Sequence, residues 1–513
     1  MESSASSGQP SNVTAPADKV PVPEKIVYGF GTFHDMWGHW LYPNIGWQVF
    51  NIFLGVAPWL IGIALFLNRL FDAISDAVFG WLSDNTRTRW GRRRPYILIA
   101  GVLSGLGLPL LVAVAPGWGS STFFGTEVPH YFWFMVVSSA IYLPIMSAFK
   151  MPFDSLGYEM TPDYHERTSV WSFRNAVQKV PELGLFFAAQ FMTMSVWVGA
   201  SGGDGWERVK LLLTDGNAWR PAAEGTRPNM LLAAQVYTVV LGLIMAAAAV
   251  AMFFVLRERY YTKVTERKQG KVRLIETLGL TLKCKPFRMQ MAMKLSYAMG
   301  TSMVAALGYY ATLYYVCRGN IAEGAVWNFW MGISGMVLGF LGIPVYAFVA
   351  RRFGKRVGIM SVLSTAVLVF VGTWWFYNPD IRWLQIFASG FIAFTGAGFW
   401  MLDGAIGADV IDYDELETGK RREGAFTACG SWIMKVGMAI GAGASGVILS
   451  LTGFDADLGG AQAEFTIFMI RLLLMVIPII GLLLALAMIY FFPLTQEKMA
   501  VIRRELEARR GTV

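Results

Sequence analysis

The stretch Arg69-Leu70-Phe71-Asp72-Ala73-Ile74-Ser75-Asp76 places two aspartates one helical turn apart inside a mostly apolar segment. A carboxylate within a membrane span is costly unless it faces a wet or charged interior, and here two carboxylates share one helical stripe with Arg69. This segment ends in an arginine-dense run, with Arg87, Arg89, Arg92, Arg93 and Arg94. The arrangement indicates a cation site within a membrane protein.

The composition also indicates a membrane protein. Hydrophobic residues make up 55% of the 513 residues and charged residues only 15%, and the mean hydropathy is +0.46. A soluble domain carries nearer a quarter of charged residues. The net charge of +8 does not indicate nucleic acid, because the basic residues cluster at the ends of apolar segments, where they orient a membrane protein. Cys284, Cys317 and Cys429 are scattered without metal-ligand spacing and are expected to pack between helices.

Apolar segments long enough to cross about 30 Å of hydrocarbon recur along the chain and predict about twelve helices in two sets of six. The first set is expected at residues 26 to 54, 57 to 83, 96 to 115, 129 to 151, 170 to 198 and 229 to 256. The second set is expected at residues 288 to 317, 325 to 350, 356 to 377, 382 to 408, 424 to 452 and 465 to 492.

This division predicts two six-helix bundles, at residues 26–256 and 288–492, joined by a cytoplasmic linker at residues 257–287. Residues 1–25 lack the apolar region of a signal peptide and are expected to be a disordered tail, and residues 493–513 a second tail. With alternating spans, the strongly basic turns all fall on the side of the two tails. The positive-inside rule therefore places both termini in the cytoplasm, with the protein in the plasma (inner) membrane.

The two halves contain similar segments at corresponding positions. The segment from Gly80 to Gly91, after the second span, has a weaker counterpart after the eighth span in Ala350-Arg351-Arg352-Phe353-Gly354-Lys355-Arg356. Repeated six-helix halves are typical of transporters that rock between two states. The fold expected is therefore an all-α membrane protein with the major facilitator architecture. Neither G-x-S-x-G nor a nucleotide loop occurs, so we expect no enzyme and no cofactor.

Four ordered blocks resemble the glycoside-pentoside-hexuronide:cation symporters, the family of the melibiose permease. These blocks are Tyr28 to Gly31, Asp72 to Pro95, Thr161 to Thr168, and Ala408 to Glu415 with Thr418 to Gly424. The resemblance covers nearly the whole chain apart from its two tails. It implies a secondary active symporter with a small-molecule solute, and neither a protein partner nor nucleic acid is expected.

The resemblance implies that Asp72 and Asp76 are the carboxylates of the cation site. A hard cation such as sodium prefers several oxygen ligands, so the hydroxyls of Ser75 and of Ser147, at the family's fourth-helix ligand position, are added. Two carboxylates this close also make coupling to a proton possible, because their repulsion favours protonation of one of them. The structural alternative is that Arg69 simply neutralises the pair.

Lys435, in the middle of the eleventh span, matches the family lysine that is thought to link the cation and sugar sites. An ammonium among glycines and alanines needs an acidic partner, so we expect Lys435 to contact Asp72 and Asp76 and to act in coupling with Arg69. The structural alternative is that Lys435 snorkels to the membrane interface.

The expected substrate site departs from the melibiose permease, because Lys150 and Asp154 stand where that protein has an aspartate and a tryptophan. The family's first-helix aspartate aligns with Met36, one residue after Asp35. Lys150 beside Arg174, which resembles a family arginine near the substrate, would suit a hexuronide carboxylate. Lys150 could equally pair with Asp154 at i+4 and leave the cavity neutral. Aromatic faces for a sugar ring are expected from Trp400, which matches a family aromatic, and from Trp37 and Tyr42.

The acidic cluster Asp409, Asp412, Asp414 and Glu415 lies beside basic residues at a cytoplasmic helix end. We expect it to form a cytoplasmic gate of ion pairs with Arg87, Arg89 and Arg92 that lock one state and break in the other. His165 and Glu166 are expected to serve gating or packing.

The function predicted is import of a sugar, glycoside or uronide with Na⁺ or H⁺ bound at Asp72 and Asp76. A lysophospholipid or other amphiphile is the alternative solute, because vertebrate lysophospholipid carriers belong to the same broader family. A continuous apolar opening from cavity to bilayer would favour the lipid, and a sealed polar cavity would favour the sugar. Membrane lipid is the only other expected partner, and a sensor or membrane enzyme would give no counterflow.

Replacing either aspartate, as Asp72→Asn or Asp76→Asn, should abolish cation-driven uptake while leaving expression intact, because each carboxylate is expected to be a ligand of the cation. Uptake against a gradient measures the effect, and expression of each variant is the control. Unchanged concentrative uptake in both variants would remove the cation-site assignment.

Overall fold

The computed structural model describes residues 19–86, 88–123, 125–161, 164–258, 283–419 and 423–510. Residues 1–18 of the predicted N-terminal tail, residues 259–282 of the predicted linker and Arg87 of the predicted gate lie outside the described residues. Within the described residues the chain folds into twelve long helical crossings, six before and six after residues 259–282.

The N-terminal half begins with a crossing built from five consecutive short helices: α1 (Val22–Gly29), α2 (Gly31–Phe33), η1 (His34–Leu41), α3 (Tyr42–Gly46) and η2 (Trp47–Phe53). Its other crossings are α4 (Pro58–Asn85), α5 (Arg94–Gly107) with η3 (Leu108–Val112), α6 (His130–Glu159), α7 (Tyr164–Met192) and α9 (Met230–Val255). The segments η1 and η2 are π-helical.

The C-terminal half begins with α12 (Lys285–Ser302), α13 (Ala305–Tyr310) and the π-helical η6 (Ala311–Val316), which together form one crossing. It continues with α14 (Ile321–Phe353), α15 (Lys355–Phe376), α16 (Leu384–Thr418), α17 (Glu423–Leu451) and α18 (Glu464–Tyr490). The last element is α19 (Gln496–Arg510).

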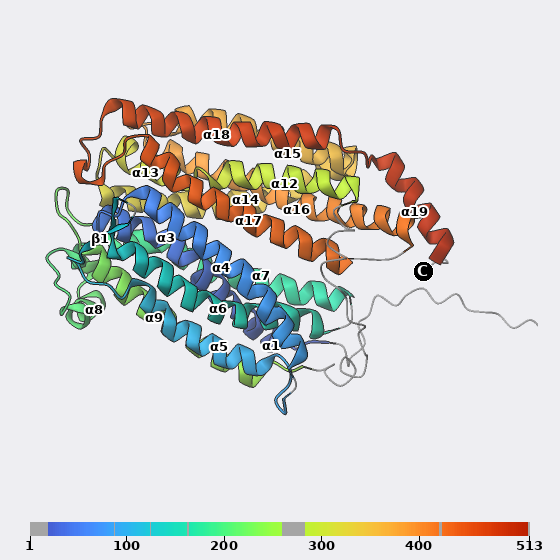
Figure 1. The fold of residues 1–513 in the computed structure, drawn as a ribbon, viewed down its shortest axis with the longest axis horizontal. Helices are drawn as coiled ribbons and strands as arrows, with labels where there is room; N and C mark the ends of the chain where they lie inside the picture. Colours follow the sequence, from blue (N-terminus) through green and yellow to red (C-terminus); the bar gives the residue numbers. More distant parts are fainter. Residues whose placement is uncertain are drawn as a thin grey trace, which may run out of the picture.

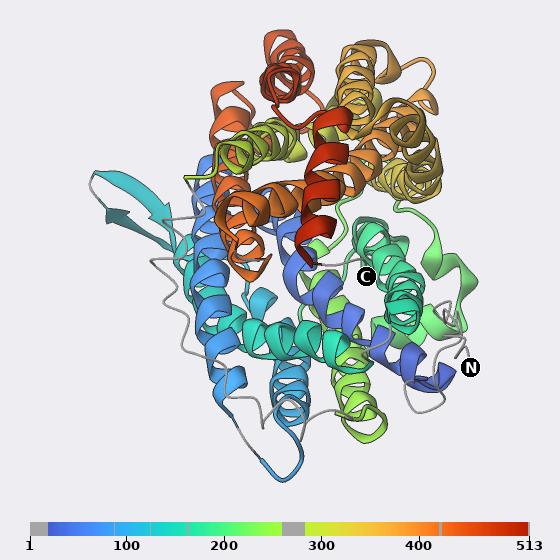
Figure 2. The ribbon, with the colours of Figure 1, turned by 90° about the vertical axis from the view of Figure 1, so that its right-hand side faces the viewer.

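One end of the molecule, here called the hairpin face, carries the β1–β2 hairpin and α8 (Gly205–Thr214) (Figure 1). In the hairpin, β1 (Ser120–Phe123) pairs antiparallel with β2 (Thr126–Pro129). Three 3₁₀ turns complete this end of the fold: η4 (Ser195–Trp197), η5 (Gly216–Trp219) and η7 (Ala456–Leu458). The opposite end, the basic face, carries Arg94, Lys355 and α19, and Figure 2 looks onto it with the two bundles one above the other.

Three segments show structure beyond what the sequence analysis described. The first helix begins at Val22 instead of residue 26, because Pro21 precedes it and a second proline at position 23 suits a helix start. The predicted C-terminal tail contains α19, whose Met499, Ile502 and Leu506 are buried against the C-terminal half. Residues 199–228 contain α8 and η5.

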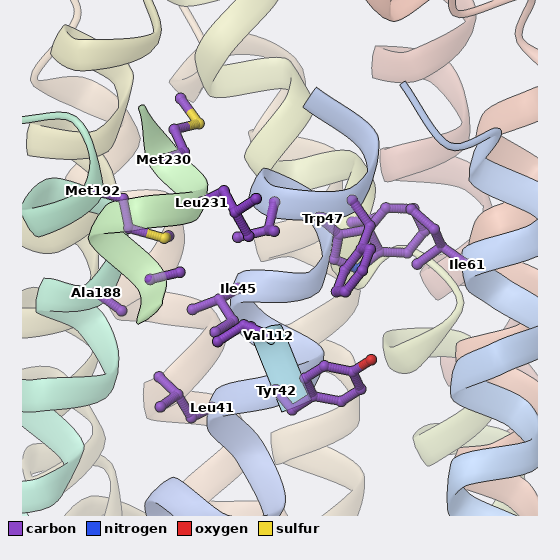
Figure 3. Close-up of a cluster of buried hydrophobic side chains, with 14 of the residues drawn as sticks. Leu41, Tyr42, Ile45, Trp47, Ile61, Val112, Ala188, Met192, Met230 and Leu231 are labelled. Carbon is purple, nitrogen blue, oxygen red and sulfur yellow. The ribbon is translucent and has the colours of Figure 1, made fainter. Parts of the chain in front are cut away.

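The hydrophobic core is continuous between the halves only near the hairpin face. One cluster of buried residues there draws on both halves, whereas towards the basic face the described core separates into two clusters, one in each half. Figure 3 shows the N-terminal part of the shared cluster, with Leu41, Tyr42 and Ile45 of the first crossing and with Met192 and Leu231 of the neighbouring elements. Because buried apolar contact holds the halves together at one end, the molecule is closed at the hairpin face.

Small residues allow the two halves to pack closely at this end. A side chain on Gly62 of α4 would meet the carbonyl oxygen of Gly443 at 2.6 Å and the Cα atom of Gly446 at 3.0 Å, both on α17. The indole of Trp47 packs edge-on against Tyr310, and the Tyr310 hydroxyl donates to Asn51. These contacts join the first crossing and α4 to the C-terminal half.

We expect Gly62→Val to lower the thermal unfolding midpoint in detergent by several degrees, because the added side chain would have to displace the backbone of α17, at a cost of about 1–3 kcal/mol. The matched control is Gly80→Val on the same helix, where no atom lies within 4 Å of the added Cβ. Equal midpoints for the two variants would contradict tight packing of the halves at Gly62.

Candidate functional site

Four of the twelve described crossings are less apolar than the others, and each carries a charged residue of the interior. Among the described residues, eight helical segments are long and apolar enough to span a membrane, which makes the chain an integral membrane protein. The first crossing, α4, α7 and the crossing that starts with α12 are not among those eight. They carry Asp35, Asp72, Arg174 and Lys294, respectively. Such residues face one another in the interior rather than lipid, because lipid cannot solvate a charge.

At the centre of the molecule an ammonium of one half contacts two carboxylates of the other. Lys435 Nζ on α17 donates to Asp72 Oδ2 on α4 at 3.1 Å and also to Asp76 Oδ2. Asp72 is buried and Asp76 is half-buried. Lys435 therefore reaches the partners expected from the sequence, and it does not snorkel to the interface.

The two aspartates keep capacity for a further ligand. Asp76 Oδ1 is buried and has no hydrogen-bond partner among the described residues, whereas the buried Asp72 Oδ1 faces a ring nitrogen of His39 at 3.4 Å. Within that part of the chain no group of three or more histidine, cysteine or acidic side chains is placed to hold a metal ion. A cation at Asp72 and Asp76 would therefore also need oxygens from hydroxyl groups, carbonyl groups or water.

The two serines predicted as cation ligands are neighbours of this pair. Ser75 Oγ and Ser147 Oγ lie 2.7 Å apart, and Ser75 Oγ also lies 2.8 Å from the carbonyl oxygen of Phe71. Both hydroxyls are buried between α4 and α6. To bind a cation, the two hydroxyl groups would have to give up their contact with each other and the contact with the carbonyl oxygen of Phe71.

Arg69, which could neutralise the two aspartates, also contacts an aromatic ring. The guanidinium carbon of the buried Arg69 lies 4.4 Å from the centre of the ring of Trp40, which is exposed, and the two form a cation–π contact. The ion pairs of Asp72 and Asp76 described above are made by Lys435 instead.

A second charged network, here called the Asp35 network, lies in the N-terminal half. Lys150 on α6 donates to Asp35 on η1, and Arg174 on α7 lies 3.6 Å from Asp35 and 3.3 Å from Asp154. The sequence left open whether Lys150 would face a substrate or pair with Asp154. In the structure its ion-pair partner is Asp35, and Arg174 pairs with Asp154. Two basic groups are thus balanced by two carboxylates.

His39 lies between the Asp35 network and the Asp72–Asp76 pair, and the sequence analysis missed it. One ring nitrogen is 3.4 Å from Asp72 Oδ1 and the other is 3.8 Å from Asp35 Oδ1. His39 lies in the π-helical segment η1, a rare backbone form that occurs often at functional sites. The signal available in the sequence was a histidine four residues after Asp35 within an apolar segment.

A cavity of about 430 Å³, here called the inter-half cavity, is lined by both halves of the molecule. Polar and aromatic side chains surround it: Trp40, Asn44, Trp47, Gln48 and Arg69 from one half, and Ser302, Tyr309, Asn328, Tyr377 and Ser445 from the other. Arg69 lies one helical turn from Asp72, so the cavity adjoins the charged centre on its hairpin-face side. It is large enough and polar enough for a small hydroxylated solute.

The aromatic residues predicted for a sugar have different positions. Trp37 is buried, its indole nitrogen donates to the carbonyl oxygen of Pro181 at 2.8 Å, and its ring stacks on Phe33. Trp37 is therefore a packing residue, and its prediction as a substrate contact is corrected. Tyr42 is likewise buried in the core. Trp400 is 44% exposed, and the ammonium of Lys294 lies 5.5 Å from the centre of its ring.

The sequence analysis also missed a buried ion pair in the C-terminal half. Lys294 on α12 lies 2.9 Å from Asp403 on α16, and Gln290 donates to the same carboxylate at 3.0 Å. The signal was present, because both are charged residues inside predicted spans, as Lys435 is.

The predicted gate residues lie at the basic face. Asp409 accepts two hydrogen bonds from Lys355 of its own half, at 2.7 and 2.8 Å. The sequence analysis had favoured the arginines after α4 as partners of this acidic cluster. Asp412 and Asp414 follow on the same end of α16. The guanidinium of Arg89 stacks on Trp90, and the backbone N–H of Arg92 donates to Glu258 at 2.8 Å.

Glu166, predicted to serve gating or packing, accepts from Lys25 and from the backbone N–H of Val20, both at 2.8 Å. It ties the start of the chain to the start of α7, which is a packing contact. The side chain of His165 lies outside the described part of the structure.

Comparison with solved structures gives the same fold. A bacterial homologue of the human lysosomal transporter Spinster, in an inward-facing and unoccupied conformation, aligns with a TM-score of 0.62 over 96% of this chain and 99% of that one, at 12% identity. The likeness to this solved structure is one of fold.

The chain belongs to the family described as MFS/sugar transport protein, whose match covers residues 46–496. The isoprimeverose transporter of Lactiplantibacillus pentosus is 24% identical over 94% of this chain and 92% of its own length. The glucuronide carrier protein homologue of Escherichia coli is 24% identical over 89% of each chain. The sodium-dependent lysophosphatidylcholine symporter 1 of Mus musculus is 22% identical over 89% of this chain and 82% of its own. The predicted family and fold class are confirmed.

Lys150→Met should lower stability by about 3 kcal/mol, because it removes one of the cations that face the buried Asp35 carboxylate. The double variant Asp35→Asn with Lys150→Met should recover part of the loss, since no unpaired charge then remains at that position. Thermal unfolding of the four proteins of this cycle measures the coupling. Simple addition of the two single effects would contradict the pairing.

Proposed function

We propose that the protein is a secondary active symporter that couples entry of Na⁺ or H⁺ to uptake of a sugar or glycoside by alternating access. The observation that carries this proposal is the contact of Lys435 in one half with both Asp72 and Asp76 in the other. A cation at the two carboxylates competes with the ammonium for the same oxygens. Its binding therefore changes the interaction between the halves.

In this mechanism the structure corresponds to the inward-facing state, with the basic face in the cytoplasm. The shared core at the hairpin face and the separate cores towards the basic face support that assignment. The gate that we propose at Asp409, Asp412 and Asp414 would form in the opposite state, when the basic face closes. The pairing of Asp409 with Lys355 in its own half is consistent with an open gate.

The inter-half cavity supports a sugar as the solute. Sugar rings present apolar C–H faces to indole rings and hydroxyl groups to amides, and the cavity offers both in Trp40, Trp47, Asn44, Gln48 and Asn328. Since Lys150 and Arg174 are balanced by Asp35 and Asp154, we propose a neutral sugar or glycoside ahead of a uronide. Arg69 is the cavity group that a uronide carboxylate would contact.

A lysophospholipid remains the second candidate, supported by the mouse relative and by an apolar pocket of about 420 Å³. Its lining includes Phe79, Tyr96, Ile99, Leu103 and Ile145, from α4, α5 and α6. Among the described residues, none lines both this apolar pocket and the inter-half cavity. A continuous apolar path between the two therefore does not support the lysophospholipid candidate.

The proposed function is tested by counterflow in proteoliposomes, with sugars, glucuronides and lysophosphatidylcholine as solutes and with Na⁺ and pH varied separately. We expect exchange of a sugar or glycoside that increases with one of the two cations. Exchange of the lysolipid alone would establish the second candidate. Exchange of no solute in any arm would refute a transport function.

Lys435→Met should lower the cation concentration that half-saturates counterflow by about tenfold, because the competing ammonium is gone, a difference of about 1.4 kcal/mol. Lys179→Met is the matched control, because Lys179 pairs with Glu182 on its own helix at 2.6 Å. An unchanged or raised half-saturating concentration in Lys435→Met would contradict competition between lysine and cation.

A further inference from the structure

A cavity of about 340 Å³, here called the basic-side cavity, lies in the C-terminal half beyond the charged centre. Its lining includes Gln290 and Lys294 of α12, Asp403 and Gly404 of α16, and Ser431 of α17. None of these residues belongs to the cation site or the inter-half cavity described above. The basic-side cavity is therefore distinct from the inter-half cavity.

The order of residues on α17 places this cavity along the axis of the molecule. Ser431 lies one helical turn before Lys435, and Met438, Ala442 and Ser445 of the inter-half cavity follow it. The same order holds on α12, where Gln290 and Lys294 precede Ser302 of the inter-half cavity. A path from the inter-half cavity to the basic face thus meets Lys435 first and the basic-side cavity next.

The polar groups of the cavity are held in place from two helices. Asp403 is 4% exposed, one of its oxygens lies 2.9 Å from Lys294 Nζ, and the other accepts from Gln290 at 3.0 Å. Gln290 also donates to the backbone carbonyl oxygen of Asp403 at 2.9 Å. An ion pair that is held in this way presents both a donor and an acceptor at fixed positions.

Open space and an aromatic face adjoin the pair. Among the described residues, no atom outside the local helix backbone lies within 4 Å of the position that a Cβ on Gly404 would take. The ammonium of Lys294 is 5.5 Å from the centre of the Trp400 ring, and Trp400 lies one turn before Asp403 on α16. A carboxylate, an ammonium and an amide beside free space offer donors and acceptors to a ring with several hydroxyl groups, and the rest of the lining is largely apolar, with Phe287, Ile411 and Phe426.

We propose that the basic-side cavity is a second sugar-binding site on the path by which the solute leaves, with Asp403 and Lys294 binding its hydroxyl groups. The proposal rests on the proposed sugar transport. It assigns Gln290 as a positioning residue for Asp403, and it makes the affinity of the transporter different from its two sides. A solute bound here lies on the basic side of Lys435 and does not contact the inter-half cavity.

The test compares half-saturating sugar concentrations on the two sides of the protein, in vesicles of each orientation. The probe is whichever of glucose, xylose, isoprimeverose and phenyl glucuronide the wild-type protein exchanges fastest. Asp403→Asn and Lys294→Gln should each raise the half-saturating concentration at the basic face by about tenfold or more, the effect of losing a hydrogen bond to a charged group. At the hairpin face it should change by less than twofold.

Gly404→Val tests the same site without removing a charge, because the added side chain fills the open space. It should raise the half-saturating concentration at the basic face as well. The matched control is Glu323→Gln, which breaks the ion pair of Glu323 with Arg382 in the same half near the hairpin face. It should leave both concentrations unchanged.

Equal effects at the two faces, or no effect in Gly404→Val together with Asp403→Asn, would overturn the second site while leaving sugar transport in place. Loss of counterflow in all three variants would also overturn it, since the ion pair would then be structural. Failure of the wild-type protein to exchange any of the four sugars would instead refute the proposed function, and the second site with it.

Discussion

The contact of Lys435 with Asp72 and Asp76 is the interaction on which the structure depends. Three charges lie where water is scarce, and the interior can hold them only while they compensate one another. Because the ammonium belongs to one six-helix half and the carboxylates to the other, this compensation also joins the halves. Any ion that binds the carboxylates in place of the ammonium alters the contact between the bundles, and a rocking transporter requires a link of that kind.

The packing of the rest of the molecule determines at which end the two halves are held together. Close packing of Gly62 against α17, together with the shared core around Trp47 and Tyr310, closes the hairpin face. Towards the basic face each half keeps its own core, so the halves can separate there without exposing a common apolar surface. The Asp35 network lies beside the ion site, with His39 between them, and the inter-half cavity adjoins the same centre. The proposed cation site, the inter-half cavity and the contact between the halves thus involve neighbouring side chains.

Much of this arrangement could be predicted from the sequence. The lengths of the apolar segments predict the twelve crossings, and the cost of burying a charge predicts that Lys435 would contact the aspartates of α4. The stripe formed by Met499, Ile502 and Leu506 in α19 also carried a helical signal, although residues 493–513 were expected to be a tail. The cost of burying charge applies equally to Lys294 and Asp403, so their pairing was also predictable from the sequence.

Other features depend on tertiary structure and could not be predicted. Lys150 had two possible carboxylate partners, and only the packing of α6 against the first crossing selects Asp35. The spacing of Trp37 does not say which side of its helix faces the cavity, and the π-helical segments change that direction along the first crossing. The position of His39 between two carboxylates follows from the same local geometry.

The central claim is that a cation at Asp72 and Asp76 competes with Lys435 and thereby shifts the relative position of the halves. The most direct measurement is the distance between spin labels at Ser201 and Asp380, exposed residues of the hairpin face in opposite halves, with and without the coupling cation. We predict that the cation shifts the distance distribution in the wild-type protein and not in Asp72→Asn. A distribution that is insensitive to Na⁺ and to pH in the wild-type protein would contradict the account.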